Sequence, residues 1–523
     1  MTRVSITVIG VWILAAGVAP ASVRPNSMAA RKGVTYYVDA TRGSDHSSGL
    51  SPRVPWRTIA KVNATHLSPD DSVLFKRGEV WREQLIPQSG DKAGHITYGA
   101  YGKGSKPLLL GSVSRNRASD WTDEGGNIWT TSSIPVDVGC IIFDHGASVG
   151  TKVWSRNALA RQGDFWYDGP QRAVAMYSAS DPASRYSDIE CALTRHIINE
   201  GGKSYVIYES LDLRCGAAHG IGGGDTHHII ARHCDLSFIG GGHQFTTEDG
   251  RPVRYGNGIE FWAGAHDNLV EECRLWEIYD AALTNQGFTD NAQVNIRYRN
   301  NVIWNCEYSF EYWNGKGSIT DHIYFENNTC VNAGHGWGHR QRPDPSGRHL
   351  MFYNNQAKTT HFYVRGNVFY QTPETTYGVF GISGGPLMPQ GANGALPERG
   401  PGRASTLPDE VRLGTQRSLH DLPVMQEPRQ CCLALANDWS SGLVMDHNCW
   451  YQPSGIMIRW VADEYAMDRF ADYRARTGQD EHSIAGDPLF VSMSAHDFRP
   501  AARSPVCHLS ATGSYAGALP CRR

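Results

Sequence analysis

The chain has 523 residues, with 56 Gly, 15 Trp and 23 Tyr and only 19% charged residues. This length exceeds one ordinary hydrophobic core, whereas an array that grows by adding repeats has no such limit. The net charge of −3 is small for this size and argues against nucleic-acid or membrane-surface binding, because both usually need a concentrated basic excess.

Residues 1–21 have the features of a secretory signal peptide. Arg3 supplies a positive charge, residues 4–18 form an apolar stretch, and residues 19–21 read Ala-Pro-Ala, a small-x-small cleavage site. The apolar stretch is short for a membrane span, which favours a cleaved signal peptide. We therefore expect a secreted or periplasmic protein without stable membrane insertion. The alternative interpretation is an uncleaved membrane anchor.

The segments that frame residues 34–523 are distinctive. Residues 35–39 read Thr-Tyr-Tyr-Val-Asp, residues 55–59 Pro-Trp-Arg-Thr-Ile, and residues 486–490 Gly-Asp-Pro-Leu-Phe. They resemble the opening and closing segments of bacterial right-handed parallel β-helix proteins of the pectate-lyase-like superfamily. The resemblance implies an all-β solenoid of the exported, carbohydrate-active type, with a short helix near residues 59–67 that caps the first coil. It covers nearly the whole mature chain and is specific for the fold but not for the reaction.

A repeated pattern in the middle of the chain supports the same architecture. A short alternating strand is followed, at one fixed position, by Cys234, Cys273, Asn301, Asn328, Asn367 and Asn448. Positions 273, 301 and 328 are separated by 28 and 27 residues, within the range of solenoid repeats. An inward Asn at a bend can satisfy backbone groups of its own and neighbouring coils, and Cys can fill the same place by packing. We predict a structural ladder rather than a metal or redox site.

The expected organisation is a single β-helix domain over residues 34–523. Its parts are an N-terminal cap with the first coils (34–200), central coils (205–383), an inserted loop (384–430), and the last coils with a C-terminal cap (431–523). The inserted loop is rich in Gly and Pro without a strand period, so it either borders a binding groove or is disordered.

Twelve cysteines are an even number, which is compatible with disulfides in an exported protein. Most of them belong to the interior ladder. Cys431, Cys432, Cys507 and Cys521 lie outside it and are the disulfide candidates, with their pairing left open.

Three acidic residues are expected on neighbouring coils. Aligning the strands after the ladder places Glu260 and Glu311 at one outward position two coils apart, roughly 10 Å at the backbone. Asp280 lies on the coil between them, roughly 8 Å from either glutamate. The same alignment turns Ile259, Ala281, Phe310 and Trp337 inward.

Carboxylates in this arrangement suit the hydrolysis of a glycosidic bond. One carboxylic acid protonates the leaving oxygen, and a second carboxylate activates water or attacks the sugar, at about 6.5–9.5 Å for inverting enzymes. We predict a polysaccharide-degrading glycoside hydrolase with Glu260, Asp280 and Glu311 as catalytic residues, without cofactor or metal. The expected substrate-binding residues are Trp262, Tyr312, Trp313, Asn314, Asn285, His339 and Arg340. The paired His227 and His228 are not expected to bind metal, because adjacent strand residues point to opposite faces.

Two alternatives stay open. Lys316 could be the base of a polysaccharide lyase acting on a uronate-containing glycan, with Ca²⁺ as a possible cofactor. The second alternative is a non-catalytic solenoid that binds glycans or has a structural role in the envelope, because a fold alone does not assign a function.

Overall fold

The computed structural model describes residues 32–372, 430–510 and 514–522. The expected signal peptide, at residues 1–21, lies outside the described residues, as does the expected inserted loop except for Gln430.

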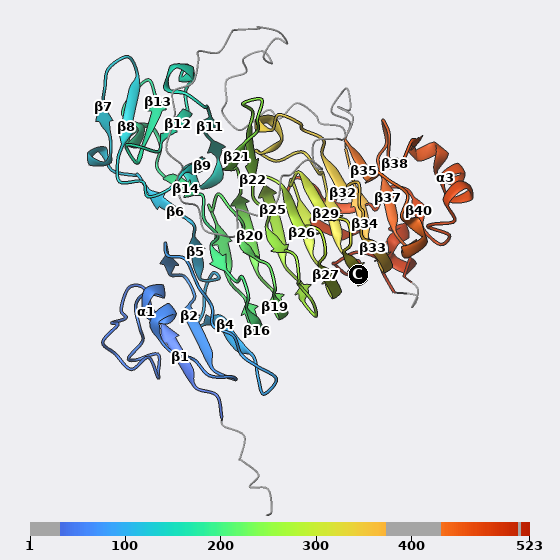
Figure 1. The fold of residues 1–523 in the computed structure, drawn as a ribbon, viewed down its shortest axis with the longest axis horizontal. Helices are drawn as coiled ribbons and strands as arrows, with labels where there is room; N and C mark the ends of the chain where they lie inside the picture. The colour runs from blue at the N-terminus through green and yellow to red at the C-terminus, as the bar shows by residue number, and fades with distance from the viewer. Residues whose placement is uncertain (1–31, 373–429, 511–513, 523) are drawn as a thin grey trace, which may run out of the picture.

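The chain forms a right-handed parallel β-helix with three long sheets, as the sequence predicted (Figure 1). Sheet A contains β1 (Thr35–Val38), β2 (Ser72–Lys76), β4 (Ile96–Tyr101), β16 (Ser204–Glu209), β19 (His227–Arg232), β24 (Leu269–Glu271), β27 (Ala292–Arg299), β30 (Ile319–Glu326), β33 (Lys358–Arg365) and β36 (Leu443–Asp446). Sheet B contains β3 (Val80–Trp81), β5 (Leu108–Leu110), β17 (Asp212–Arg214), β20 (Asp235–Ile239), β25 (Arg274–Ile278), β28 (Val302–Trp304), β31 (Thr329–Val331), β34 (Val368–Tyr370), β37 (Cys449–Tyr451) and β40 (Ile484–Ala485). Sheet C contains β15 (Ile198–Asn199), β18 (Ile221–Gly223), β23 (Ile259–Phe261), β26 (Ala281–Gly287), β29 (Tyr308–Asn314), β32 (Arg348–Phe352), β35 (Cys431–Leu435), β38 (Ile458–Trp460) and the antiparallel β39 (Asp463–Tyr465).

The predicted Asn ladder closes the corner between sheets A and B. The side-chain oxygen of Asn328 accepts hydrogen bonds from the backbone and side-chain nitrogens of Asn301 at 3.0 Å each. Asn328 and Asn367 repeat this pattern one coil further on, and Cys234 and Cys273 extend the row as buried free thiols. The ladder therefore satisfies corner amides that no sheet hydrogen bond reaches.

Two helices cover parts of the solenoid. α1 (Ile59–Ala64) lies at the N-terminal end, where the buried Ile59 and Val62 pack into the interior, so the expected capping helix is confirmed in a shorter form. Near the other end of the molecule, α3 (Phe470–Thr477) packs through Phe470 and Tyr473 (Figure 1).

A largely antiparallel unit interrupts the solenoid between β5 and β15. It contains β6 (Ser112–Ser114), β7 (Thr122–Asp123), β8 (Ile128–Thr131), β9 (Val138–Phe143), β10 (Ser148–Val149), β11 (Thr151–Lys152), β12 (Asp164–Asp168), β13 (Ala173–Tyr177), α2 (Pro182–Arg185) and β14 (Ile189–Leu193). Ile141, Phe143, Phe165 and Met176 belong to a hydrophobic cluster of its own. Part of the segment expected to form first coils, 34–200, is therefore this unit, which projects to the upper left in Figure 1.

Shorter antiparallel pairs flank the coils. β21 (Gly242–Thr246) pairs with β22 (Pro252–Tyr255) in a hairpin that precedes β23, and β41 (Phe490–Ser492) pairs with β42 (Asp497–Pro500) near the C-terminus. The described residues include no helix long and apolar enough to cross a membrane.

One disulfide joins two of the four candidate cysteines. Cys507 and Cys521 are bonded, 14 residues apart. Cys431 and Cys432 are buried free thiols, because they lie on the inner strand β35. Their proposed role as disulfide partners is therefore wrong.

We expect the double variant Cys507→Ser/Cys521→Ser to loosen the closing segment that packs near Thr329 through Ala518. A loop of this length gains about 3 kcal/mol from its crosslink in the chain-entropy model. Limited proteolysis should cleave the segment near residue 515 in the variant and spare the parent. Equal resistance of both proteins would show that packing alone holds the segment, and equal cleavage would show that the disulfide does not protect it.

Candidate active site

Glu260 and Glu311 lie in one column on the outer face of sheet C. Glu260 of β23 pairs with Thr284 of β26, which pairs with Glu311 of β29. Two strand spacings separate the two glutamate backbones by roughly 10 Å, as the repeat predicted. Both side chains are nevertheless buried, at 8% and 5% exposure.

The neighbours of these glutamates point into the solenoid. Phe261, Asn285 and Tyr312 form the adjacent column, and each is fully buried. Asn285 donates to Gln293 at 2.6 Å, and the Tyr312 hydroxyl lies 2.6 Å from Thr359 Oγ1. The substrate-binding roles expected for Asn285 and Tyr312 are therefore wrong, because strand alternation sends residues next to Glu260 and Glu311 to the interior.

Asn314 is also an interior residue. It is fully buried at the end of β29, and its side-chain amide donates to Gln293 and Thr320 at 2.6 and 3.1 Å. The contact with substrate expected for Asn314 is therefore wrong, because its side chain also points into the solenoid.

Asp280 comes to the site from the corner before β26. The predicted alignment placed Ile259 beside Ala281, but Ile259 pairs with Leu283, so Asp280 lies four residues before Thr284, the partner of Glu260. Asp280 lies 2.9 Å from Arg342 Nη1. It interacts electrostatically with both Glu260 and Glu311, so the three carboxylates form one cluster.

Trp337 does not share the inward column, because the next strand of sheet C is β32 rather than residues 336–340. Residues 332–347 form a loop, in which Trp337 packs beside Tyr279 and its indole donates to the Glu277 carbonyl at 2.9 Å. The loop brings Arg342 over the rings of Tyr279 and Tyr308.

Glu260 is a buried carboxyl with few partners. Asn257 Nδ2 donates to it at 2.8 Å, and His219 Nε2 lies 3.2 Å from its other oxygen. Burial raises the pKa of Glu260 to about 8, opposed by the Asn257 hydrogen bond and reinforced by the charge of Asp280. At neutral pH this group therefore holds a proton for much of the time.

Glu311 is subject to the same effects of burial and neighbouring charge. Burial raises its pKa well above the usual range, with a further contribution from Asp280, while Arg342 and a hydrogen bond from Tyr353 oppose the shift. Burial also raises the pKa of Asp280, against the attraction of Arg342.

Glu307 anchors the loop that carries Arg342. It accepts hydrogen bonds from the backbone of Ser346 and Gly347 at 2.7 and 3.0 Å and lies 2.8 Å from His339 Nδ1. Although burial opposes it, His339 and Arg342 lower the pKa of Glu307 to about 2. His339 is therefore engaged by a buried carboxylate, and the role expected for it in substrate binding gives way to a structural one.

An aromatic group borders the column. Trp262 and Trp313 both pack against Phe288 edge to face, with centroid separations of 5.0 and 6.4 Å. Trp262 follows Glu260 by two residues and Trp313 follows Glu311 by two, so both side chains share the outer face with the carboxylates. Lys316 lies in the exposed turn after β29, and Arg340 is exposed in the loop after β31.

Several residues of the cluster were not found from the sequence as site residues. His219, Arg342 and Tyr353 are distant in the chain from the carboxylates that they contact, whereas Glu307 and Tyr308 lie just before Glu311. A basic group near residues 335–342 was visible in the sequence, but its pairing with Asp280 and Glu307 depends on the fold of the loop.

No family model matches the sequence. A lacto-N-biosidase from Bifidobacterium longum is 32% identical over 97 residues, a match that spans 18% of this chain and only 6% of that protein. Among solved structures, a glycoside hydrolase aligns at TM-score 0.46 and 9% identity over 82% of this chain and 94% of its own. The pectate lyase Pel9A aligns at TM-score 0.39 and 11% identity over 94% and 98%. The fold assignment rests on the parallel sheets of the chain itself.

Proposed function

We propose that this protein is an exported carbohydrate-active enzyme, a glycoside hydrolase that cleaves a polysaccharide on the outer face of sheet C. The observation that carries the proposal is the cluster of Glu260, Asp280 and Glu311, two buried carboxyl groups and one partly buried one in mutual electrostatic contact. The disulfide between Cys507 and Cys521 supports an oxidising compartment.

The cluster divides naturally into acid and base. Three neighbouring carboxyl groups, two of them buried, cannot all ionise at neutral pH, so the cluster retains at least one proton. Glu311, whose pKa is raised by burial and by the charges of Asp280 and Glu260, is the proposed acid that protonates the leaving oxygen. Asp280, next to the Arg342 guanidinium, is the proposed base or nucleophile. Glu260 would hold its proton and position the sugar with His219 and Asn257.

The surrounding groups support hydrolysis over β-elimination. A lyase base must give up its proton near neutral pH. Burial raises the pKa values of Tyr308 and Tyr353 above their ordinary values. The carboxylates around Arg342 raise the pKa of its guanidinium, although burial opposes this shift. These three side chains therefore keep their protons near neutral pH. Lys316, the base proposed for a lyase, lies in an exposed turn. The local likeness to a lacto-N-biosidase adds to the hydrolase proposal.

A panel of glycans, including glycosides of lacto-N-biose and uronate polymers, tests the proposal. We expect new reducing ends without the ultraviolet absorbance of unsaturated uronosyl products. Such absorbance, particularly if it requires added Ca²⁺, would establish the lyase instead. Binding without any cleavage across the panel would favour the non-catalytic solenoid.

A further inference from the structure

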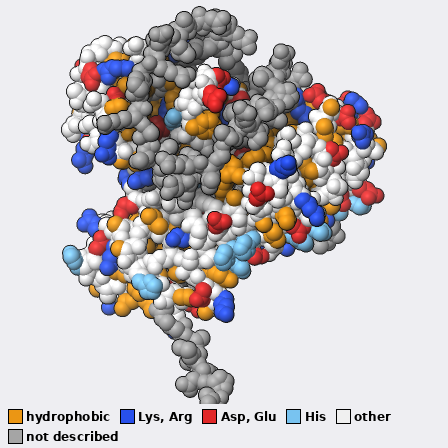
Figure 2. Space-filling view, in the orientation of Figure 1, with side chains coloured by type: hydrophobic (Ala, Val, Ile, Leu, Met, Phe, Trp, Pro, Cys, Tyr) orange, Lys and Arg blue, Asp and Glu red, His pale blue; other side chains and the backbone are white. Residues whose placement is uncertain are grey.

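The outer face of sheet A carries histidines on several coils, away from the carboxylates of sheet C. Figure 2 shows histidine side chains along the lower part of the molecule, where sheet A lies in Figure 1. They include His227, His228, His266, His322 and His361. The Nδ1 atoms of His227 and His228 lie 3.0 Å apart. Adjacent histidines therefore share a face here, against the expectation from strand alternation, because His228 has a φ of 55° that breaks the alternation.

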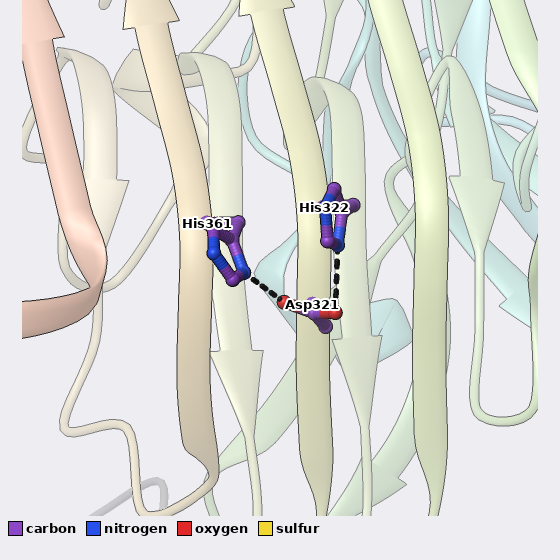
Figure 3. Close-up of side chains that lie close together, drawn as sticks. All are labelled: Asp321, His322 and His361. Atoms are coloured by element: carbon purple, nitrogen blue, oxygen red, sulfur yellow. Dashed lines mark hydrogen bonds and ion pairs between the residues drawn. The ribbon is translucent and has the colours of Figure 1, made fainter.

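The most convergent group consists of Asp321 and His322 on β30 and His361 on β33 (Figure 3). His322 Nδ1 lies 2.6 Å from Asp321 Oδ2, and His361 Nδ1 lies 2.7 Å from Asp321 Oδ1. The carboxylate thus has one imidazole at each oxygen. One potential ligand atom from each residue lies within 4.8 Å of the other two.

The backbone fixes this convergence. Asp321 pairs with Thr360, and Ile323 with Phe362, so His322 and His361 lie opposite each other between two paired positions. Both histidines have left-handed backbone angles, with φ of 56° and 51°. Their rings stack at a centroid distance of 4.4 Å and an interplanar angle of 25°. Two stacked rings with their Nδ1 atoms toward one carboxylate are thus held by sheet register rather than by a loose loop.

A threonine on the neighbouring strand also binds the Asp321 carboxylate. Thr360 Oγ1 donates to Asp321 Oδ1 at 2.6 Å. Thr360 thereby orients the carboxylate, as residues that hydrogen-bond to metal ligands commonly do.

We propose that Asp321, His322 and His361 form a binding site for a divalent transition-metal ion, Zn²⁺ in particular, that joins the coils of β30 and β33. Two imidazoles and one carboxylate suit Zn²⁺, whereas Ca²⁺ and Mg²⁺ prefer oxygen ligands. Zn–N and Zn–O bonds of about 2.0–2.2 Å place tetrahedral ligand atoms roughly 3.3 Å apart. The two nitrogen–oxygen separations of 2.6 and 2.7 Å need to widen by less than about 1 Å to admit the ion. Both histidines are partly exposed, which leaves room for water as the fourth ligand.

Among the described residues, a related group lies at the end of β36, where Asp446 meets His447 and His482 from the segment before β40. His482 Nδ1 and His447 Nδ1 lie 2.8 and 3.1 Å from the same oxygen of Asp446. His447 again has a left-handed φ, of 55°. Both rings approach one carboxylate oxygen here, whereas at Asp321 each ring approaches a different oxygen. Metal binding at this second group would obscure a test of the first site, so the second group is removed by mutation.

The test uses the full chain with no added histidine tag, carrying His482→Ala and freed of metal by chelation. We expect this protein to bind one equivalent of Zn²⁺ in calorimetric titration at neutral pH, and Co²⁺ to give a visible absorption band of low coordination number. Adding His361→Ala should weaken the Zn²⁺ affinity at least about tenfold and remove the Co²⁺ band.

A matched control is His266→Ala in the same background, since His266 is a half-exposed histidine on the same sheet beside an aspartate, Asp267. It should leave both signals unchanged. Failure of the His482→Ala protein to bind Zn²⁺, or equal binding with and without His361, would overturn the proposal and leave Asp321 as the centre of an ion-pair network only. Circular dichroism of each variant distinguishes loss of a ligand from loss of the fold.

Discussion

Glu311→Gln is expected to reduce kcat/KM on the cleaved glycan by about 10²–10⁴-fold, the usual contribution of a general acid. Glutamine keeps the shape of the side chain but has no proton to give to the leaving oxygen. The measurement is release of reducing ends at fixed enzyme concentration, on the substrate found in the glycan panel. A variant that keeps activity within tenfold of the parent would remove Glu311 from the role of acid.

The same variant should not be less stable than the parent. Burial raises the pKa of Glu311 above its ordinary value of 4.5, so the folded chain retains a proton that the unfolded chain releases as the pH rises. This carboxyl therefore costs the parent stability increasingly above about pH 4.5. We expect equal unfolding temperatures near pH 4 and a higher one for Glu311→Gln at pH 7.

Glu272→Gln provides the matched control for the replacement of a glutamate by glutamine. Glu272 is an exposed glutamate in the turn after β24 and lies 3.0 Å from His233, away from the sheet C cluster. Its replacement should leave both activity and the pH dependence of stability unchanged. A large activity loss in this control would indicate that net charge, rather than a specific proton donor, governs the reaction.

The solenoid was predictable because each repeat leaves backbone polar groups at one corner that a side chain must hydrogen-bond. Every coil turns at the same corner, and Asn301, Asn328 and Asn367 recur there to satisfy backbone groups. The common register of Glu260 and Glu311 followed from the same repeat. A residue that recurs for a structural reason thus allows equivalent positions on different coils to be aligned from the sequence.

The rest of the site depends on features that a repeat does not encode. Tyr312 was assigned to the outer face from its aromatic character, although it adjoins the outward Glu311 and must alternate inward. Arg342 reaches Asp280 from a loop 62 residues further along the chain. The antiparallel unit between β5 and β15 has strands of ordinary length, and the sequence contains no repeat that separates it from the coils.

Asn328→Ala is expected to cause a large loss of stability, because the Asn328 side chain makes four hydrogen bonds, as many as those of Asn367 and Asn448. Its side-chain oxygen accepts from two nitrogens of Asn301, and its amide donates to the Tyr298 carbonyl at 2.9 Å and to Asn367 at 3.2 Å. Alanine leaves these groups buried without partners, at about 1–3 kcal/mol each. Since neighbours relax, we expect about 4 kcal/mol in total, measured as the lowering of the unfolding midpoint in denaturant.

Cys273→Ala separates the hydrogen bonds of the ladder from its packing. The thiol of Cys273 is fully buried one coil before Asn301, but its contacts with the carbonyls of Glu271 and Ala231 are long, at 3.4 and 3.6 Å. Loss of a small buried group with weak hydrogen bonds should cost about 1 kcal/mol. A loss several times smaller than that of Asn328→Ala would attribute the corner's stability to amide hydrogen bonds. Equal losses would contradict this account, because packing volume would then explain both positions and the repeated asparagines would serve only to fill space.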